Sequence, residues 1–200
     1  MEAVLPAGSA ALQRIFAMFA GKAEHIRAEA VPDIREAADR EEENRLAERL
    51  LDTYGNSLLR LAYTYLHNRQ DAEDAVQDTL LQYLRTRPAP ESPEHEKAWL
   101  LRVAANLCKN RLRYNRLRKT DELDENLIAE QREDLSFVWE AVRSLPRKYR
   151  EVIHFFYYEE YSTAEISRLL GRKESTVRSD LHRGREKLRK ILKEAYDFGE

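Results

Sequence analysis

The spacing of apolar residues restricts the fold of this chain more than any other feature of its sequence. From Glu41 onward, large apolar side chains recur every three or four positions, beginning with Leu46, Leu50, Tyr54, Leu58, Leu61 and Tyr65. This repeat is typical of amphipathic helices, and no alternating pattern of useful length predicts a strand. The 200 residues include only six glycines and six prolines, and the helix-favouring Leu, Ala, Glu and Arg dominate. We therefore expect an all-α fold.

Two small helical domains joined by a flexible acidic linker are predicted. The divisions are an N-terminal extension of unknown role at 1–40, a first domain at 41–118, the linker at 119–134 and a second domain at 135–196. A helical pattern within the extension spans Ala10 to Ala20. In the first domain, Gly55 marks a break or kink, Asp71 caps a helix, and the prolines of 87–93 require a loop.

The net charge of −2 hides a basic, acidic, basic order along the chain. The segment 109–119, KNRLRYNRLRK, has six basic residues and no acid, and 172–193 has nine basic residues against three acids. Between them, 121–134 has seven acids and one arginine. This order suggests polyanion-binding surfaces separated by an acidic connector. Solvated helix faces with local ion pairs would explain the charges equally well, so charge alone leaves both interpretations open.

Several kinds of functional site are missing from the sequence. The one cysteine, Cys108, allows no disulfide framework and no multi-cysteine metal site. The five histidines lack the spacing of metal ligands, and no glycine-rich phosphate loop occurs. No apolar run reaches about eighteen residues, and the first residues lack the pattern of a signal peptide. We expect a cytoplasmic protein that is not an enzyme, with no cofactor, metal site, small-molecule substrate or membrane insertion.

A helix-turn-helix is predicted between Tyr161 and Lys193. Ser162 and Glu165 form a capping box that opens a short helix, and Gly171 ends it, where a left-handed backbone favours glycine. A second helix begins near Glu174, and its opposite sides differ in character. The apolar side comprises Val177, Leu181, Gly184 and Leu188. The other side is small, polar and basic, which suits a helix that enters the major groove. An ordinary helical hairpin with a solvated face is the alternative.

Three segments carry a family resemblance. They are LPRKYREVIHFFYYEEYSTAEISRLLGRKESTVRSDLHRGREKLRK at 145–190, DAEDAVQDTLLQYLR at 71–85 and WLLRVAANLCKNRLR at 99–113. The first resembles region 4 of the sigma-70 family, closest to its extracytoplasmic-function (ECF) group. The second resembles the helix of region 2, and the third resembles the promoter-melting helix that follows it. The resemblance covers about 42–193 and implies an RNA polymerase sigma factor that directs promoter recognition, DNA melting and transcription initiation.

The resemblance also implies three sets of contact residues. Contacts with the minus-35 element fall on Arg178, Ser179, Asp180, His182 and Arg183. Contacts with the minus-10 element fall on Asn106, Lys109, Asn110, Arg111 and Arg113. Docking on polymerase falls on Asp71, Glu73, Asp74, Gln77 and Asp78, although acids there also favour a helix N-terminus. Asp180 replaces a commonly basic residue, so it either accepts from a cytosine amine or joins an ion pair.

The partners implied by the resemblance are the RNA polymerase core, through its clamp helices and flap, promoter DNA and an anti-sigma factor. The loop 86–97 matches the family's loop that captures a flipped base. Its prolines and acids are unusual for a loop that contacts DNA. Trp99, which follows the loop, is expected in the core. A helix-turn-helix transcriptional regulator that acts without polymerase core is the alternative function. The acidic patch at 71–78 favours the sigma factor, because such a patch suits docking on a basic protein surface.

Overall fold

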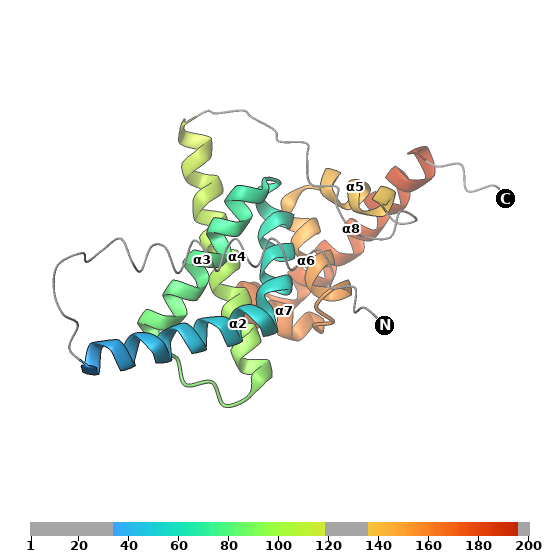
Figure 1. Cartoon of the computed structure of the whole chain (residues 1–200). Coiled ribbons are helices and arrows are strands. Elements are labelled where there is room, and N and C mark those ends of the chain that lie inside the picture. Colours follow the sequence, from blue (N-terminus) through green and yellow to red (C-terminus); the bar gives the residue numbers. More distant parts are fainter. Residues whose placement is uncertain (1–33, 119–135, 196–200) are drawn as a thin grey trace, which may run out of the picture.

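The computed structural model describes residues 34–118 and 136–195, and every regular element in these two ranges is an α helix (Figure 1). The helices are α2 (Ile34–Leu66), α3 (Arg69–Thr86), α4 (Pro93–Arg118), α5 (Ser136–Ser144), α6 (Arg147–Tyr157), α7 (Thr163–Leu170) and α8 (Glu174–Ala195). The predicted all-α fold is confirmed. The predicted linker and the helical pattern of the N-terminal extension lie outside the described residues.

Helices α2, α3 and α4 form the first domain around an apolar core. Leu50, Leu58 and Leu61 of α2 are fully buried where α2 packs on α3 and α4. Burying one such side chain contributes about 1.5–3 kcal/mol, so the repeat that predicts α2 also holds it in place. Trp99 is partly buried and packs edge-on against Tyr83, with 5.3 Å between the ring centroids, as expected for a core position.

Two local predictions in this domain are wrong, and a third is wrong in part. Helix α2 is not broken at Gly55, but it bends along its length, so that its first part (blue) and its last part (teal) run in different directions (Figure 1). The N-cap of α3 is Asn68, whose side chain accepts from the Asp71 N–H at 3.0 Å, so Asp71 lies in the first turn instead. Pro93 does not belong to the loop but begins α4, where its missing N–H would have no helical partner.

Helices α5 to α8 form the second domain, in which α6 and α8 approach each other closely. Gly184 of α8 is buried, and a Cβ there would lie 2.9 Å from Ile153 Cδ1 and 3.2 Å from Tyr149 Cβ. A larger side chain would push α6 away, which explains the glycine on the apolar side of α8. The fully buried core of this domain includes Val152, Phe155, Ile166 and Val177.

The two domains lie directly against each other. Helix α6 packs on α2, and α7 packs on α4; Figure 1 shows α6 beside α2. Buried apolar residues of both domains belong to one continuous core. The two domains therefore form one packed unit in this structure.

Candidate nucleic-acid interface

The turn between α7 and α8 has the geometry predicted from the sequence. The Ser162 N–H donates to Glu165 Oε2 at 2.8 Å, and the Glu165 N–H donates to Ser162 Oγ at 3.3 Å. Hydrogen bonds from the Ser162 side chain and backbone lower the pKa of the Glu165 carboxyl. Gly171 ends α7 with a φ of 65°, which strains other residues. Thr163 Oγ1 donates to Glu174 Oε1 at 2.8 Å and joins the two helix starts, so α8 is held firmly against α7.

Four of the five residues predicted to contact the minus-35 element lie on the exposed side of α8. They are Arg178, Ser179, His182 and Arg183. Val177 and Leu181 pack into the core on the opposite side. Arg178 pairs with Glu174 within the helix at 2.6 Å, yet its side chain remains 69% exposed. A row of hydrogen-bond donors therefore faces solvent, as base reading in a major groove requires.

Asp180, the fifth residue, faces the protein instead. Its side chain is buried, and its Oδ2 lies 3.5 Å from Arg172 Nη1 in the turn. Arg172 also forms an ion pair with Glu151 of α6. Of the two roles that the sequence left open for Asp180, the structure shows the ion pair. A base contact would first have to break that pair and expose a buried carboxylate.

The residues predicted to contact the minus-10 element are of two kinds. The exposed ones, along α4, are Asn106, Asn110 and Arg113. Lys109 is partly buried, with its Nζ 3.7 Å from Glu151 Oε2 and 5.9 Å from the centroid of the Tyr65 ring. Burial lowers the pKa of the Lys109 ammonium to about 8. Arg111 is also engaged, in this case with acids of α3.

Arg111 joins the predicted DNA surface to the predicted docking surface. Its Nη2 lies 2.7 Å from Asp71 Oδ1 and 2.8 Å from Asp74 Oδ2, which ties α4 to α3. An open cavity of about 640 Å³ lies at this junction. The residues lining the cavity are Asp71, Ala75, Asp78, Leu107, Asn110, Arg111, Arg113 and Tyr114. Residues predicted to contact the minus-10 element and residues predicted to dock on polymerase thus line the same cavity.

The rest of the predicted docking set is unevenly placed. Asp78 is exposed beside the cavity. Glu73 pairs with Arg69 one turn away at 2.7 Å. Gln77 is buried in the first domain, so its side chain is not on the surface of α3. Asp78 is therefore the exposed acid of this set, whereas Asp71, Glu73 and Asp74 pair with arginines and Gln77 lies within the fold.

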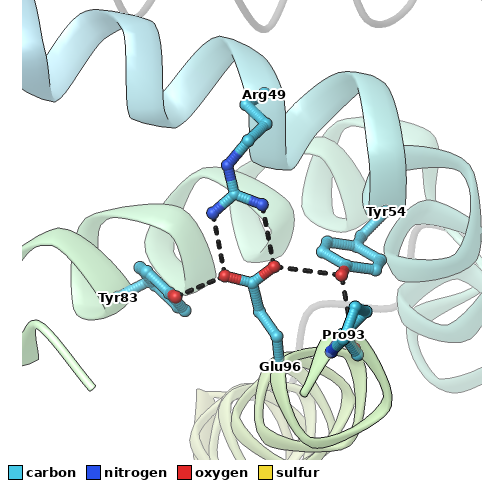
Figure 2. Close-up of polar contacts among 5 residues, drawn as sticks. All are labelled: Arg49, Tyr54, Tyr83, Pro93 and Glu96. Atoms are coloured by element: carbon cyan, nitrogen blue, oxygen red, sulfur yellow. Dashed lines mark hydrogen bonds and ion pairs between the residues drawn. The ribbon is translucent and has the colours of Figure 1, made fainter. Parts of the chain in front are cut away.

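Figure 2 shows a buried carboxylate that sequence reasoning missed. Glu96 is 6% exposed and accepts two hydrogen bonds from Arg49, each 2.8 Å long. The hydroxyls of Tyr54 and Tyr83 donate to the same carboxylate at 3.0 and 2.5 Å, and Tyr54 also lies 3.3 Å from the Pro93 carbonyl. The Arg49 bonds are the largest cause of a pKa of about 2 for Glu96. No sequence signal marked this site, because Arg49 is 47 positions away.

The Glu96 cluster holds the loop between α3 and α4, which the sequence predicted to capture a flipped base. A cavity of about 260 Å³ lies beside this loop. Its lining comprises Tyr83, Pro88, Ala89, Pro90, Glu91, His95, Glu96 and Trp99. The rings and the buried carboxylate give this cavity a defined wall, while the prolines restrict the loop itself.

A second missed cluster centres on Glu151 of α6. This carboxylate is 1% exposed and lies between the two domains. It accepts from the Tyr65 hydroxyl of α2 and pairs with Lys109 of α4 and with Arg172 of the turn. The carboxylate therefore connects the predicted minus-10 surface to the helix-turn-helix.

Other kinds of site are lacking in the described parts of the chain. Within 34–118 and 136–195, no group of three or more His, Cys, Asp or Glu side chains could hold a metal ion. None of the helices in these ranges combines the length and the apolar character needed to cross a membrane. The thiol of Cys108 is fully buried, and burial raises its pKa to about 12.

Two family models match the chain, one on each domain. They are Sigma-70 region 2, at residues 50–118, and Sigma-70, region 4, at residues 138–188. The first match ends with α4, and the second includes the whole of α6, α7 and the turn into α8. The two motifs thus occur in the order in which the structure shows the two bundles.

Known relatives and solved structures agree with these matches. The ECF RNA polymerase sigma factor SigW of Bacillus subtilis is 28% identical over 165 residues, covering 72% of this chain and 88% of SigW. SigL of Mycobacterium tuberculosis, also an ECF sigma factor, is 32% identical over 155 residues, covering 72% of this chain and 88% of SigL.

Two solved structures share the fold. One is the sigma factor RpoE in complex with the anti-sigma factor NepR from Bartonella quintana, with a TM-score of 0.60, 22% identity, and coverage of 73% of this chain and 96% of that chain. The other is CnrH in complex with the cytosolic domain of CnrY, with a TM-score of 0.57, 24% identity, and coverage of 80% of this chain and 96% of that chain. By identity, matched length and motif order, the chain belongs to the sigma-70 family of RNA polymerase sigma factors, within its ECF group.

Proposed function

We propose that this ECF sigma factor reads promoter DNA with two surfaces, α8 at the minus-35 element and α4 at the minus-10 element. The observation that carries the proposal is the exposed row of Arg178, Ser179, His182 and Arg183 on a helix held by a capped partner. Such a helix presents side chains to base edges at a fixed angle. On α4, Asn106, Asn110 and Arg113 supply amide and guanidinium donors suited to unpaired bases and backbone phosphates.

Asp180 acts in this proposal as a positioning residue and not as a base reader. Its ion pair with Arg172 holds the turn against α8, and Glu151 holds Arg172 from the other side. Neutralising Asp180 would therefore disturb the approach angle of α8 before it changed any base contact. The acidic residue is tolerated near DNA because it is turned away from the exposed row.

We assign the RNA polymerase core as the protein partner of the acidic side of α3. Asp78 is exposed, and Asp71 and Asp74 are each about one-third exposed beside it. This negative surface complements basic clamp helices, while the second domain would dock on the flap. The likeness to RpoE, solved with the anti-sigma factor NepR, supports an anti-sigma factor as a further partner. The protein would act in the cytoplasm as an initiation subunit and not as an enzyme.

A helix-turn-helix regulator that acts without polymerase core is not favoured. Such a regulator has no use for region 2, whereas the match to region 2 extends over residues 50–118. Run-off transcription with purified core polymerase tests the choice directly. Failure of the full chain to bind core polymerase would contradict the sigma-factor function, even if the chain still bound DNA.

Arginine substitutions test the assignment of α8. We expect Arg178→Ala and Arg183→Ala each to weaken binding of polymerase holoenzyme to a minus-35 promoter fragment by about 1–3 kcal/mol, because each removes a bidentate donor. Arg45→Ala is the matched control, since it removes an exposed arginine of α2 far along the chain from both DNA surfaces. Unchanged affinity and unchanged base preference in both α8 variants would reject this register of contacts.

A further inference from the structure

A buried arginine without an acidic partner lies where α5, α6 and the end of α2 meet. Arg150 of α6 is 7% exposed, and it is the only lysine or arginine among the buried residues of 34–118 and 136–195. Its Nη1 contacts His67 Nε2 and donates to the Arg143 carbonyl at 2.7 Å. No carboxylate of these two ranges pairs with it. Buried charges in folded proteins are normally paired, so the position of this guanidinium needs an explanation.

The charged groups that act on Arg150 include two further arginines. Burial, Arg143 and Arg147 lower the pKa of the Arg150 guanidinium to about 10. Burial and the nearby Arg150 and Arg143 lower the pKa of His67 to about 4, so this imidazole is neutral at pH 7. We call Arg143, Arg147 and Arg150 the arginine cluster. It combines three positive charges and, within the described parts of the chain, no carboxylate that offsets them.

The arginine cluster differs from the other basic side chains of the fold. Half-buried basic side chains elsewhere have carboxylate partners, as Lys97 does with Glu159 at 2.7 Å. Arg147, by contrast, is exposed and forms no ion pair within the residues that the structure describes. Arg143 is half-buried, and its Cζ lies 5.7 Å from the centroid of the Tyr63 ring. An aromatic ring does not neutralise a guanidinium, so the positive charge of the cluster persists.

The first turn of α6 adds to this positive charge. Helix α6 begins at Arg147, and its N-cap, Pro146, makes no side-chain cap hydrogen bond. No acidic residue occupies the first turn. Helix α7 is different, since Ser162 and Glu165 close its start with a capping box. The N–H groups and the dipole of an uncapped helix start favour an anion.

Arg150 is directed at this helix start. Side chains of a helix lean towards its N-terminus, and the bond to the Arg143 carbonyl places the Arg150 guanidinium at the junction of α5 and α6. Its Nε is buried without a hydrogen-bond partner in the described ranges, and so is Nδ1 of His67. Because His67 Nε2 faces an arginine donor, the ring proton belongs on Nδ1. Two buried N–H donors therefore lack acceptors beside a helix start that favours anions.

We propose that the arginine cluster and the start of α6 form a binding site for the terminal phosphate group of a small molecule. Such a group carries about two negative charges near neutral pH and accepts paired hydrogen bonds from guanidinium groups. A carboxylate or a backbone phosphate diester carries one charge and would leave most of the cluster uncompensated. The site goes beyond the proposed function, since none of its three arginines belongs to the surfaces assigned there to DNA or to polymerase.

Calorimetric titration of the full chain with inorganic pyrophosphate tests the site. Sodium chloride keeps the ionic strength constant during the titration, so that screening of the surface charges does not change. We expect saturable binding of one pyrophosphate per chain. The full chain includes the acidic segment 121–134, so saturable binding also shows that this segment does not fill the site.

Two substitutions remove members of the cluster that lie outside the buried core. Arg147→Ala removes the exposed arginine and Arg143→Ala the half-buried one. Each should weaken pyrophosphate binding about tenfold or more, as expected from losing a charge-assisted hydrogen bond. Arg168→Ala, which removes an exposed arginine of α7, is the matched control and should bind as the wild type does. Circular dichroism confirms that each variant remains helical. Absence of saturable binding, or cluster variants that bind no more weakly than the control, would overturn the inference.

A DNA duplex of random sequence distinguishes a small-molecule site from a DNA backbone site. We expect Arg147→Ala to bind this duplex with wild-type affinity, and pyrophosphate at saturating concentration not to displace the duplex from the wild-type protein. If Arg147→Ala instead lowered duplex affinity and reduced its salt dependence by about one phosphate contact, and pyrophosphate displaced the duplex, the cluster would be a DNA backbone contact and the small-molecule site would be rejected.

Discussion

The two proposed DNA surfaces of this sigma factor are held in place in different ways. Helix α8 is positioned by neighbours in the sequence: the Ser162 cap, the Gly171 turn and the apolar side of α8 itself. Helix α4 and the loop before it are positioned by side chains from distant helices, above all Arg49 on Glu96 and Arg111 on the acids of α3. One surface depends on local geometry and the other on long-range charge.

This difference has a thermodynamic consequence. A helix cap contributes about 1 kcal/mol and acts within one turn. A buried carboxylate with an arginine and two tyrosine hydroxyls leaves several polar groups without partners when it is removed, and each such group costs about 1–3 kcal/mol. We therefore expect the first domain to respond more strongly than the second to loss of a single positioning side chain.

Removing the Glu96 carboxylate should have the largest effect. We expect Glu96→Ala to lower the free energy of unfolding by about 2–4 kcal/mol. This value allows for the Arg49 side chain being half exposed, since solvent screens its pair with Glu96. Urea unfolding followed by circular dichroism measures this change. The matched control is Glu41→Ala, which breaks an exposed pair with Arg45 on α2 and should change stability by less than about 0.5 kcal/mol. Equal effects of the two substitutions would mean that the Glu96 cluster does not hold the first domain.

The pH dependence of the free energy of unfolding is a second test of the Glu96 cluster. The pKa of Glu96 is about 2 in the folded protein and lies below the ordinary carboxyl value of 4.5. Its contribution is therefore fully present above pH 4.5 and is lost as the pH falls towards 2. Wild-type protein should lose more stability over this range than Glu96→Gln, and parallel curves for the two proteins would refute the assignment.

Loss of the α7 cap should have a smaller and more local effect. We expect Ser162→Ala to cost about 1 kcal/mol, because the Glu165 N–H loses its acceptor and the capping box is broken. Ser167→Ala, within the same helix, should cost nothing, since alanine favours helix interiors. Hydrogen exchange should show faster opening of α7 and unchanged protection of α2. Exchange that rises equally in both domains would show that the cap does not act locally.

The helix-turn-helix could be predicted from the sequence because its determinants lie close together. The cap, the left-handed Gly171 and the apolar side of α8 all fall between residues 162 and 188. The sequence left two roles open for Asp180, a base contact and an ion pair. It could not decide between them, because the partner Arg172 is itself held by Glu151 from another helix. Even here, a side chain's final direction depended on a tertiary contact.

The basic run on α4 was less predictable for the same physical reason. Charge density marked this segment as a candidate DNA surface, but Lys109 and Arg111 meet acids at least 37 positions away. The family resemblance placed Gln77 in the docking set, although its position on α3 faces the core. Residue type predicted the kind of partner, and the packing of helices decided which side chains remained exposed.

Arg111 and Arg113 provide the finest test of that distinction, because they lie two positions apart on α4. Arg111 is engaged with Asp71 and Asp74, so Arg111→Ala should cost about 0.5–1 kcal/mol of stability, a value discounted for its partial exposure. Arg113 is exposed, and Arg113→Ala should leave stability unchanged. It should instead lower DNA affinity and reduce the salt dependence of binding by about one phosphate contact. Arg102→Ala, exposed on the same helix, controls for loss of charge. If Arg111→Ala altered the salt dependence and left stability unchanged, the Arg111 pair would not persist in solution, and α4 would then be as open to DNA as α8.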